Sequence, residues 1–151
     1  LFFKGEKIIA LRKCYKEPVF TFTDFDCYVS ATFYIIKSER IDLRYLTAIL
    51  NSKLIAFWLR HKGKMQGGNY QIDKEPLLQI PIFNVKDVSP LTKIVDQILV
   101  KKESNPKANI ELLENQLDEM VFKLYGLTYE EAIVVEPDFW LSEEEYAAVE
   151  I

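Results

Sequence analysis

The sequence predicts an α+β fold: a small mixed β-sheet with packed helices comes first, and a C-terminal helical hairpin with short helices follows. Alternating apolar residues, typical of strands, are confined to the first 36 residues, and helical spacing dominates after residue 42. The charge also changes sign: residues 1–75 carry 13 Lys and Arg against 8 Asp and Glu, whereas residues 76–151 carry 6 against 15. The net charge of −4 therefore hides a basic half and an acidic half.

Three segments near the N-terminus have the pattern of strands. Residues 6–13 place a short apolar run between charges, and residues 19–25 alternate, with Phe20 and Phe22 on one face. Residues 28–36 alternate as well and are rich in aromatic and β-branched types. We expect a strand from each segment.

Two helices should follow these strands. Asp42 can cap a helix over residues 43–50. Asn51 tolerates the left-handed position that ends a helix, and Ser52 is a good N-cap for a second helix that ends near His61. Beyond it, residues 62–75 are expected to form a polar, Gly-containing loop. In residues 76–83 two prolines restrict any strand to a short or edge position.

The character of the sequence changes at residue 89. Ser89 as N-cap and Pro90 at the first helical position start one helix, which Asn105-Pro106 ends. A second apolar stripe over residues 110–124 stops at Gly126, so the two helices should form an antiparallel hairpin. Two further short helices begin at capping boxes, Thr128 with Glu131 and Ser142 with Glu145. We accordingly expect two parts, residues 1–88 and residues 89–151.

The composition argues for a binding module. Two Cys and one His do not make a disulfide framework or a zinc finger, and neither a Gly-rich phosphate loop nor a GxGxxG motif occurs. No apolar run reaches the roughly 18 residues that a membrane span needs. No catalytic or metal-binding residues are therefore assigned, and we expect no membrane association. Because Leu1 is not an initiator Met and no signal peptide is apparent, we expect a piece of a longer protein.

The most unusual stretch is residues 62–71, which combine cations, amides and glycines. Cations suit phosphates and amides can bond adenine through N6 and N7, while glycine lets backbone approach another surface closely. The candidate phosphate-binding residues are Arg12, Lys13, Lys62 and Lys64. The candidate base-reading residues are Gln66, Asn69 and Gln71, and the close-approach residues are Gly67, Gly68 and Tyr70. Tyr70 could stack or pack, and a plain polar loop is the alternative.

The order of these pieces resembles the TaqI-like C-terminal specificity domain, the target-recognition part of adenine-specific DNA methyltransferases and of type IIG restriction–modification enzymes. The resemblance rests on Leu50 to Lys53 (Leu-Asn-Ser-Lys), the Gly67-Gly68 and Tyr70 loop, Lys74-Glu75 and Ile80 to Ile82. It covers about residues 6–136. Asn69 departs from the pattern, because an aromatic residue often follows the glycines directly.

The resemblance implies a non-catalytic module that binds double-stranded DNA for catalytic domains upstream in the same polypeptide. S-adenosylmethionine and Mg²⁺ would belong to those upstream modules, and the protein would be cytoplasmic in a bacterium or archaeon. A second copy of the chain, paired through the helices as a homodimer, is a further candidate partner. The alternative is a protein–protein interaction module, or one like a type I specificity subunit, that uses the helical hairpin.

Overall fold

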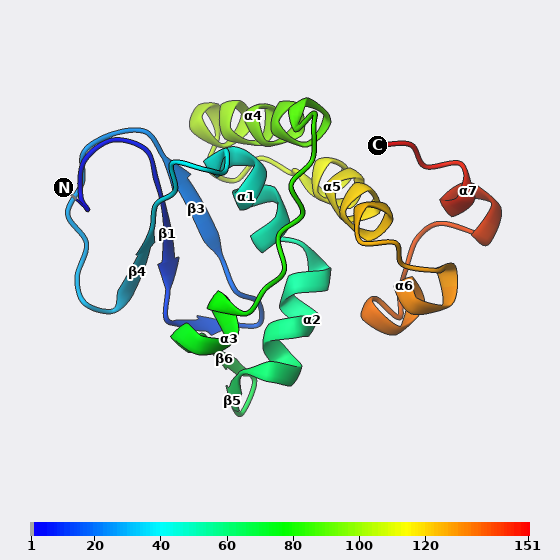
Figure 1. Cartoon of the computed structure of the whole chain (residues 1–151), viewed down its shortest axis with the longest axis horizontal. Helices are drawn as coiled ribbons and strands as arrows, with labels where there is room; N and C mark the ends of the chain where they lie inside the picture. The colour runs from blue at the N-terminus through cyan, green and yellow to red at the C-terminus, as the bar shows by residue number, and fades with distance from the viewer. Residues whose placement is uncertain (1) are drawn as a thin grey trace.

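Two small antiparallel sheets and seven helices form an α+β fold over residues 2–151, which the computed structural model describes apart from the side chains of Met65 and Gln66 (Figure 1). The predicted fold class is therefore confirmed. The strands pair in two antiparallel sheets, however, and not in one mixed sheet.

The first sheet has the strand order β3-β1-β4, with β1 at Lys7–Leu11, β3 at Phe20–Thr23 and β4 at Phe33–Ile36. Its inner face contributes Ile8, Ala10 and Phe20 to the core. The strand expected over residues 28–36 is shorter, because its partner β1 ends at Leu11. The Arg12 N–H donates to the Thr32 carbonyl (3.0 Å), and beyond that point the chain turns into the second sheet.

The second sheet has the order β2-β6-β5, with β2 at Lys13–Tyr15, β5 at Lys64–Gln66 and β6 at Asn69–Gln71. The prediction of a loop over residues 62–75 is thus wrong, since β5 and β6 form a hairpin. Gly67 and Gly68 make its two-residue turn, and Gly67 has a φ of +62°. A positive φ at the first turn residue is typical of a hairpin turn that matches the strand twist.

Helices α1 (Leu43–Leu50) and α2 (Lys53–Lys62) begin where the sequence predicts. Asp42 accepts from the backbone of Arg44 and Tyr45, and Ser52 accepts from Ile55 N–H. The expected left-handed conformation of Asn51 is wrong, because its φ is −86°. Its side chain instead forms hydrogen bonds with the backbone of strand β3.

The apolar stretch expected to hold at most a short or edge strand contains helix α3 (Lys74–Leu78). Pro76 lies in its first turn, where a missing N–H costs no helical hydrogen bond. The chain then crosses the molecule as a loop that two tyrosines hold. The Tyr45 hydroxyl donates to the Phe83 carbonyl (2.8 Å) and the Tyr125 hydroxyl to the Pro81 carbonyl. Burial raises the pKa of Tyr125 to about 12.

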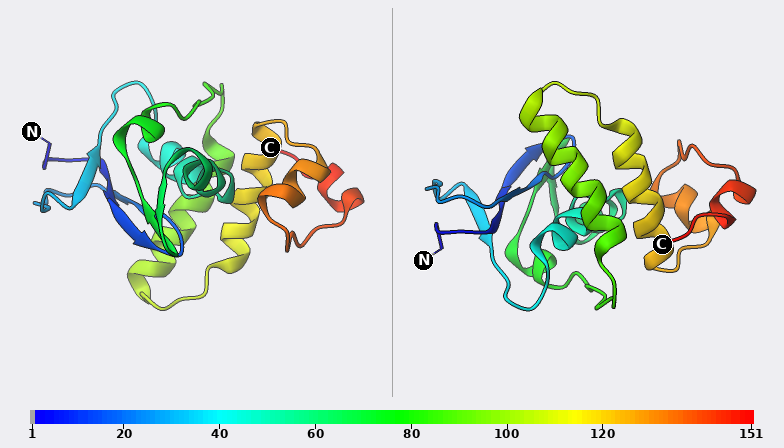
Figure 2. Two further views of the ribbon diagram at one scale, coloured as in Figure 1. Left: turned by 90° about the horizontal axis from the view of Figure 1, so that it is seen from below. Right: turned by 90° about the horizontal axis from the view of Figure 1, so that it is seen from above.

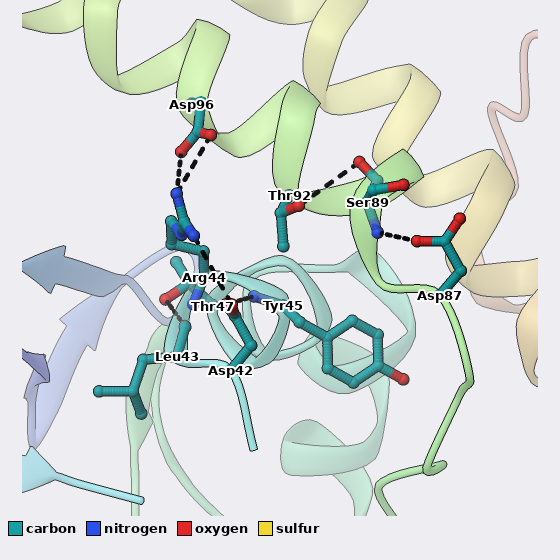
Figure 3. Close-up of polar contacts among 9 residues, drawn as sticks. All are labelled: Asp42, Leu43, Arg44, Tyr45, Thr47, Asp87, Ser89, Thr92 and Asp96. Carbon is teal, nitrogen blue, oxygen red and sulfur yellow. Dashed lines mark hydrogen bonds and ion pairs between the residues drawn. The ribbon is translucent and has the colours of Figure 1, made fainter. Parts of the chain in front are cut away.

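Helices α4 (Ser89–Ser104) and α5 (Glu111–Leu124) form the predicted hairpin and lie side by side in Figure 2. The N-cap is Val88 and not Ser89, and Asp87 accepts from the Ser89 N–H (2.9 Å). Figure 3 shows how α4 is attached to α1: Asp96 accepts from the Arg44 guanidinium at 3.3 Å.

The end of α5 and the tail, residues 126–151, have the structure that the local sequence signals predict. Gly126 has a φ of +70°, and the chain after α5 closes back with bonds from Gly126 N–H and Leu127 N–H to carbonyls of the last turn. Helices α6 (Tyr129–Val135) and α7 (Glu143–Ala147) begin at the two predicted capping boxes, each with both of its hydrogen bonds.

One core joins the sheets to the hairpin, because its buried residues run from Ile8 in β1 to Val121 in α5. A second, smaller cluster of Phe122, Ala132 and Tyr146 holds the tail. The division at residue 88 stays a prediction.

A four-residue junction, Leu50 to Lys53, connects these parts. The Asn51 side chain accepts from the Phe20 N–H (2.9 Å) and donates to the Phe20 carbonyl (2.7 Å), so it binds the edge of β3 as a neighbouring strand would. The Lys53 N–H donates to Asp118 Oδ1 of α5 (2.7 Å). The Lys53 ammonium lies 2.9 Å from Glu136 Oε2, at the end of α6.

Asp118 is an unusual group in this junction, because only 4% of it is exposed. Burial raises the pKa of Asp118 to about 7, and the nearby Glu114 and Glu17 add to the rise. The backbone hydrogen bond and the positive charge of Lys53 act in the opposite direction. Asp118 is therefore partly protonated near neutral pH.

This raised pKa predicts how stability depends on pH. An unfolded Asp has a pKa of about 3.9, so the contribution of Asp118 is complete below pH 4 and is lost as the pH rises through 7. The Asp118→Asn variant keeps an oxygen that accepts from Lys53 and has no proton to lose. We expect it to exceed the wild type in free energy of unfolding at pH 8.5 by up to about 4 kcal/mol, and by far less at pH 5.

Urea unfolding at pH 5, 7 and 8.5 measures this difference. The exposed Asp24, changed to Asn, is the matched control and should keep the wild-type pH dependence. Parallel pH curves for the wild type and Asp118→Asn would contradict the assignment.

Candidate nucleic-acid interface

The second sheet has two chemically different faces. The register pairs Lys13 with Gln71 and Gln71 with Lys64, and it pairs Tyr15 with Asn69. The residues between them, Cys14 and Tyr70, are each 5% exposed and belong to the core. Because side chains alternate along strands, the other face points outward. We call it the reading face; its described side chains are Lys13, Tyr15, Lys64, Asn69 and Gln71.

The structure describes the side chains of two of the three predicted amides, and these two differ in exposure. Asn69 is exposed on β6, and Gln71 is half-buried two residues further on. The Gln66 backbone pairs with Asn69, but its side chain lies outside the described residues. Two of the three amides are therefore brought to one strand of the reading face.

Asp73 organises part of this face, and sequence reasoning missed it. Its Oδ1 accepts from the Gln71 amide (3.3 Å), and its Oδ2 lies 3.9 Å from the Lys64 ammonium. Asp73 is the N-cap residue of α3 but makes no side-chain cap bond, so its carboxylate is available for these contacts. No sequence signal distinguishes it, because its partner Lys64 comes from the other strand of the hairpin.

Two of the four predicted phosphate-binding residues, Lys13 and Lys64, lie on the reading face, and the other two come just before its strands. Arg12, which precedes β2, places its guanidinium 4.5 Å from the centre of the Tyr34 ring. Lys62 ends α2, with its ammonium 5.5 Å from the Trp58 ring. All four side chains are exposed, so they offer positive charge to a polyanion.

The open question for Tyr70 is resolved by its burial. It packs in the core opposite Cys14 and is only 5% exposed, so of stacking and packing the structure favours packing. Its place among the close-approach residues stays a prediction. Gly67 and Gly68 are exposed at the hairpin tip, where an added methyl group would meet no atom within 4 Å.

Tyr15 is a second residue that sequence reasoning missed. It is 75% exposed and lies opposite Asn69 on the reading face. The signal was the alternation Lys13-Cys14-Tyr15 around a cysteine that becomes buried, although three residues are too few to predict a strand by themselves.

The acidic helices are placed elsewhere. Figure 1 shows the β5–β6 hairpin at the lower end of the molecule and α7 at its right edge. Helix α7 carries Glu143, Glu144 and Glu145 in its first turn, where they favour the helix dipole. The acidic first turn of α7 therefore lies away from the β5–β6 hairpin.

The chain matches the family model of the TaqI-like C-terminal specificity domain over residues 1–82, and it belongs to that family. The predicted resemblance is thereby confirmed. A specificity domain is non-catalytic, and this one is a DNA-recognition domain of restriction–modification systems.

Two curated relatives agree with this assignment. The chain is 28% identical to the Type II methyltransferase M.HincII of Haemophilus influenzae, in a match that covers 68% of this chain and 24% of that protein. The match to the Type II methyltransferase M.HindII, from strain Rd of the same species, has the same identity and covers 23% of that protein. The chain therefore spans about a quarter of the length of the curated relatives it matches.

The residues that carry the family resemblance mostly lie in the parts of the fold that hold the second sheet in place, and not on the reading face. Leu50 to Lys53 is the junction, and Pro81 lies in the crossing loop that Tyr125 holds. Among the residues that the structure describes, no helix is long and apolar enough to cross a membrane.

The hairpin tip gives a matched pair of variants. Gly67 has a positive φ, which costs a residue with a Cβ about 1–2 kcal/mol, whereas the φ of Gly68 lies outside that region. We expect Gly67→Ala to speed amide hydrogen exchange in β5 and β6 by about tenfold, and Gly68→Ala to leave it nearly unchanged. Equal effects of the two variants would contradict the turn geometry.

Proposed function

We propose that the chain reads a DNA sequence in the major groove through the reading face, and that it positions a catalytic module of the same polypeptide on its target. The observation that carries this proposal is the register of the second sheet. It places two lysines and two amides side by side on an outward face whose opposite side is core.

The dimensions of the sheet suit this role. Neighbouring strands lie about 4.8 Å apart, so the outer strands β2 and β5 are separated by about 10 Å. The major groove is about 12 Å wide, and each base pair presents a distinct pattern of donors and acceptors there. In the proposal, Asn69 and Gln71 bond adenine N6 and N7, while Lys13, Lys64, Lys62 and Arg12 hold phosphates.

The parent protein is proposed from its relatives. Both are named Type II methyltransferases and are about four times as long as the matched part. The upstream module would methylate adenine at N6, in a methyltransferase or a type IIG enzyme that also cleaves DNA. S-adenosylmethionine and Mg²⁺ would bind that module, and the adenine would be extruded into it from the duplex. The parent protein would act in the cytoplasm of a bacterium or archaeon.

A specific observation favours a second candidate, a protein-binding function of the helical hairpin. Val100 in α4 is 62% exposed and Leu112 in α5 is 80% exposed. A groove of about 910 Å³ also lies between the hairpin and β3, lined in part by Val95, Ile98 and Leu117. Such a surface could contact an upstream domain or a second copy of the chain.

Two sets of substitutions separate base reading from phosphate binding. Alanine at Gln66, Asn69 and Gln71 should relax the preferred sequence, while alanine at Lys13 and Lys64 should weaken binding to all duplexes. Removing each phosphate-binding lysine should lower the slope of log K against log salt by about 0.9. Selection from a randomised duplex pool at about 50 mM salt, followed by salt titration, measures both effects.

The hairpin variant Val100→Ser with Leu112→Ser is the control, since the second candidate depends on these residues and DNA reading does not. An unchanged sequence preference in the triple amide variant would overturn base reading by these amides. No sequence preference in the wild type would overturn the proposed function.

A further inference from the structure

Tyr15 lies on the reading face, but base reading by the amides gives it no role. It ends β2, directly opposite Asn69 of β6, and the two residues share the outward face. Side chains directly opposite each other on antiparallel strands have Cβ atoms about 5 Å apart. A molecule that contacts Asn69 therefore comes within reach of Tyr15.

The ring of Tyr15 is left in solvent although its strand is well anchored. Tyr15 is 75% exposed, whereas Cys14, the residue before it, is buried and donates its thiol to the Leu11 carbonyl (3.1 Å). Burying a ring of this size would be favourable, and here that surface is presented outward instead. The charged end of Lys16 lies 5.5 Å from the ring centre, so a cation accompanies the aromatic surface.

The backbone after Tyr15 is held in a strained turn. Lys16 has a φ of +69°, and the Glu17 N–H donates to the Tyr15 carbonyl (2.9 Å). A three-residue turn with positive φ is the rare and strained form of the γ-turn. Such strain persists only where the surroundings over-determine it, and it is concentrated at ligand-binding sites.

The surroundings that hold this turn are clear. Pro18 is buried just after it, and Phe20 is tied to Asn51 by two hydrogen bonds. The Glu17 carboxylate lies 3.9 Å from the Lys53 ammonium. The position of Tyr15 is thus fixed from both sides, by Cys14 before it and by the junction after it. A contact made by its ring would therefore cost little backbone conformational entropy.

From this geometry we infer that Tyr15 is a specificity-determining residue, whose ring contacts the C5-methyl group of a thymine in the A·T pair that Asn69 reads or in the adjacent step. The inference rests on the proposed function. The thymine methyl is the apolar group that the major groove presents, and it stands on the same edge of an A·T pair as the adenine N6 and N7 that an amide bonds, beyond the thymine O4. Successive base pairs are 3.4 Å apart, so a 5 Å side-chain spacing spans one step.

The experiment uses deoxyuridine, which lacks only the methyl group of thymine. The full chain first selects its preferred duplex from a randomised pool at about 50 mM salt. Each thymine of that duplex is then replaced in turn by deoxyuridine, and the affinities of the wild type and of Tyr15→Ala are compared. The loss of one buried methyl group corresponds to about a fourfold change in affinity.

We expect the wild type to prefer thymine over deoxyuridine about fourfold at one position, and Tyr15→Ala to lose that preference. Tyr15→Phe keeps the ring and should retain it. Asn69→Ala should relax the sequence at the same position or the next one. Tyr28→Ala is the matched control, because Tyr28 is 86% exposed but precedes β4, in the other sheet.

The outcomes separate the two proposals. A wild type that selects no sequence overturns the proposed function and this inference with it. A wild type that selects a sequence through Asn69, while Tyr15→Ala keeps both the sequence and the thymine preference, overturns the inference alone. A uniform loss of affinity for all duplexes in Tyr15→Ala, or a change more than one step away from the Asn69 position, overturns it as well.

Discussion

The Asn51 side chain holds the edge of the first sheet, and most of the architecture depends on this attachment. Its amide accepts from the Phe20 N–H and donates to the Phe20 carbonyl, which would otherwise be unpaired at the edge of β3 beside the core. Leaving buried partners without hydrogen bonds costs about 1–3 kcal/mol for each group. The next two residues continue the connection, since Ser52 caps α2 and Lys53 bonds Asp118 of the hairpin and Glu136 of the tail.

The same junction determines where the reading face points. Helix α2 begins at the junction and runs directly into β5, and β1 continues into β2 through Arg12. The Arg12 N–H bonds Thr32 beside the first sheet, and its carbonyl accepts from the Ile72 N–H beside the second (2.7 Å). The two sheets are therefore linked through one residue. The outer face of the second sheet is left free for a partner while its inner face completes the core.

The sequence predicted those features whose causes lie within a few residues. Both capping boxes, the Asp42 and Ser52 caps and the stop at Gly126 are local, and all are present. The β5–β6 hairpin was missed because its strands have three residues each, and the third strand, β2, comes from about 50 positions earlier.

Long-range partners explain the other errors. From the sequence alone Asn51 fits a local turn, because its partner Phe20 is 31 positions away. The sequence shows which cations and amides are candidates for the site. The sequence does not show how they are arranged, since Tyr15 and Asp73 join the candidate site only through strand pairing and packing across the sheet.

The central claim is that the outer face of the second sheet, and not the helical hairpin, contacts DNA. The most direct test is an NMR titration of the isotopically labelled chain with a short mixed-sequence duplex at about 50 mM salt. The account predicts that amide shifts concentrate in residues 12–16 and 62–73 and that they weaken as salt is added. Shifts concentrated in α4 and α5, with the second sheet unaffected, would contradict it.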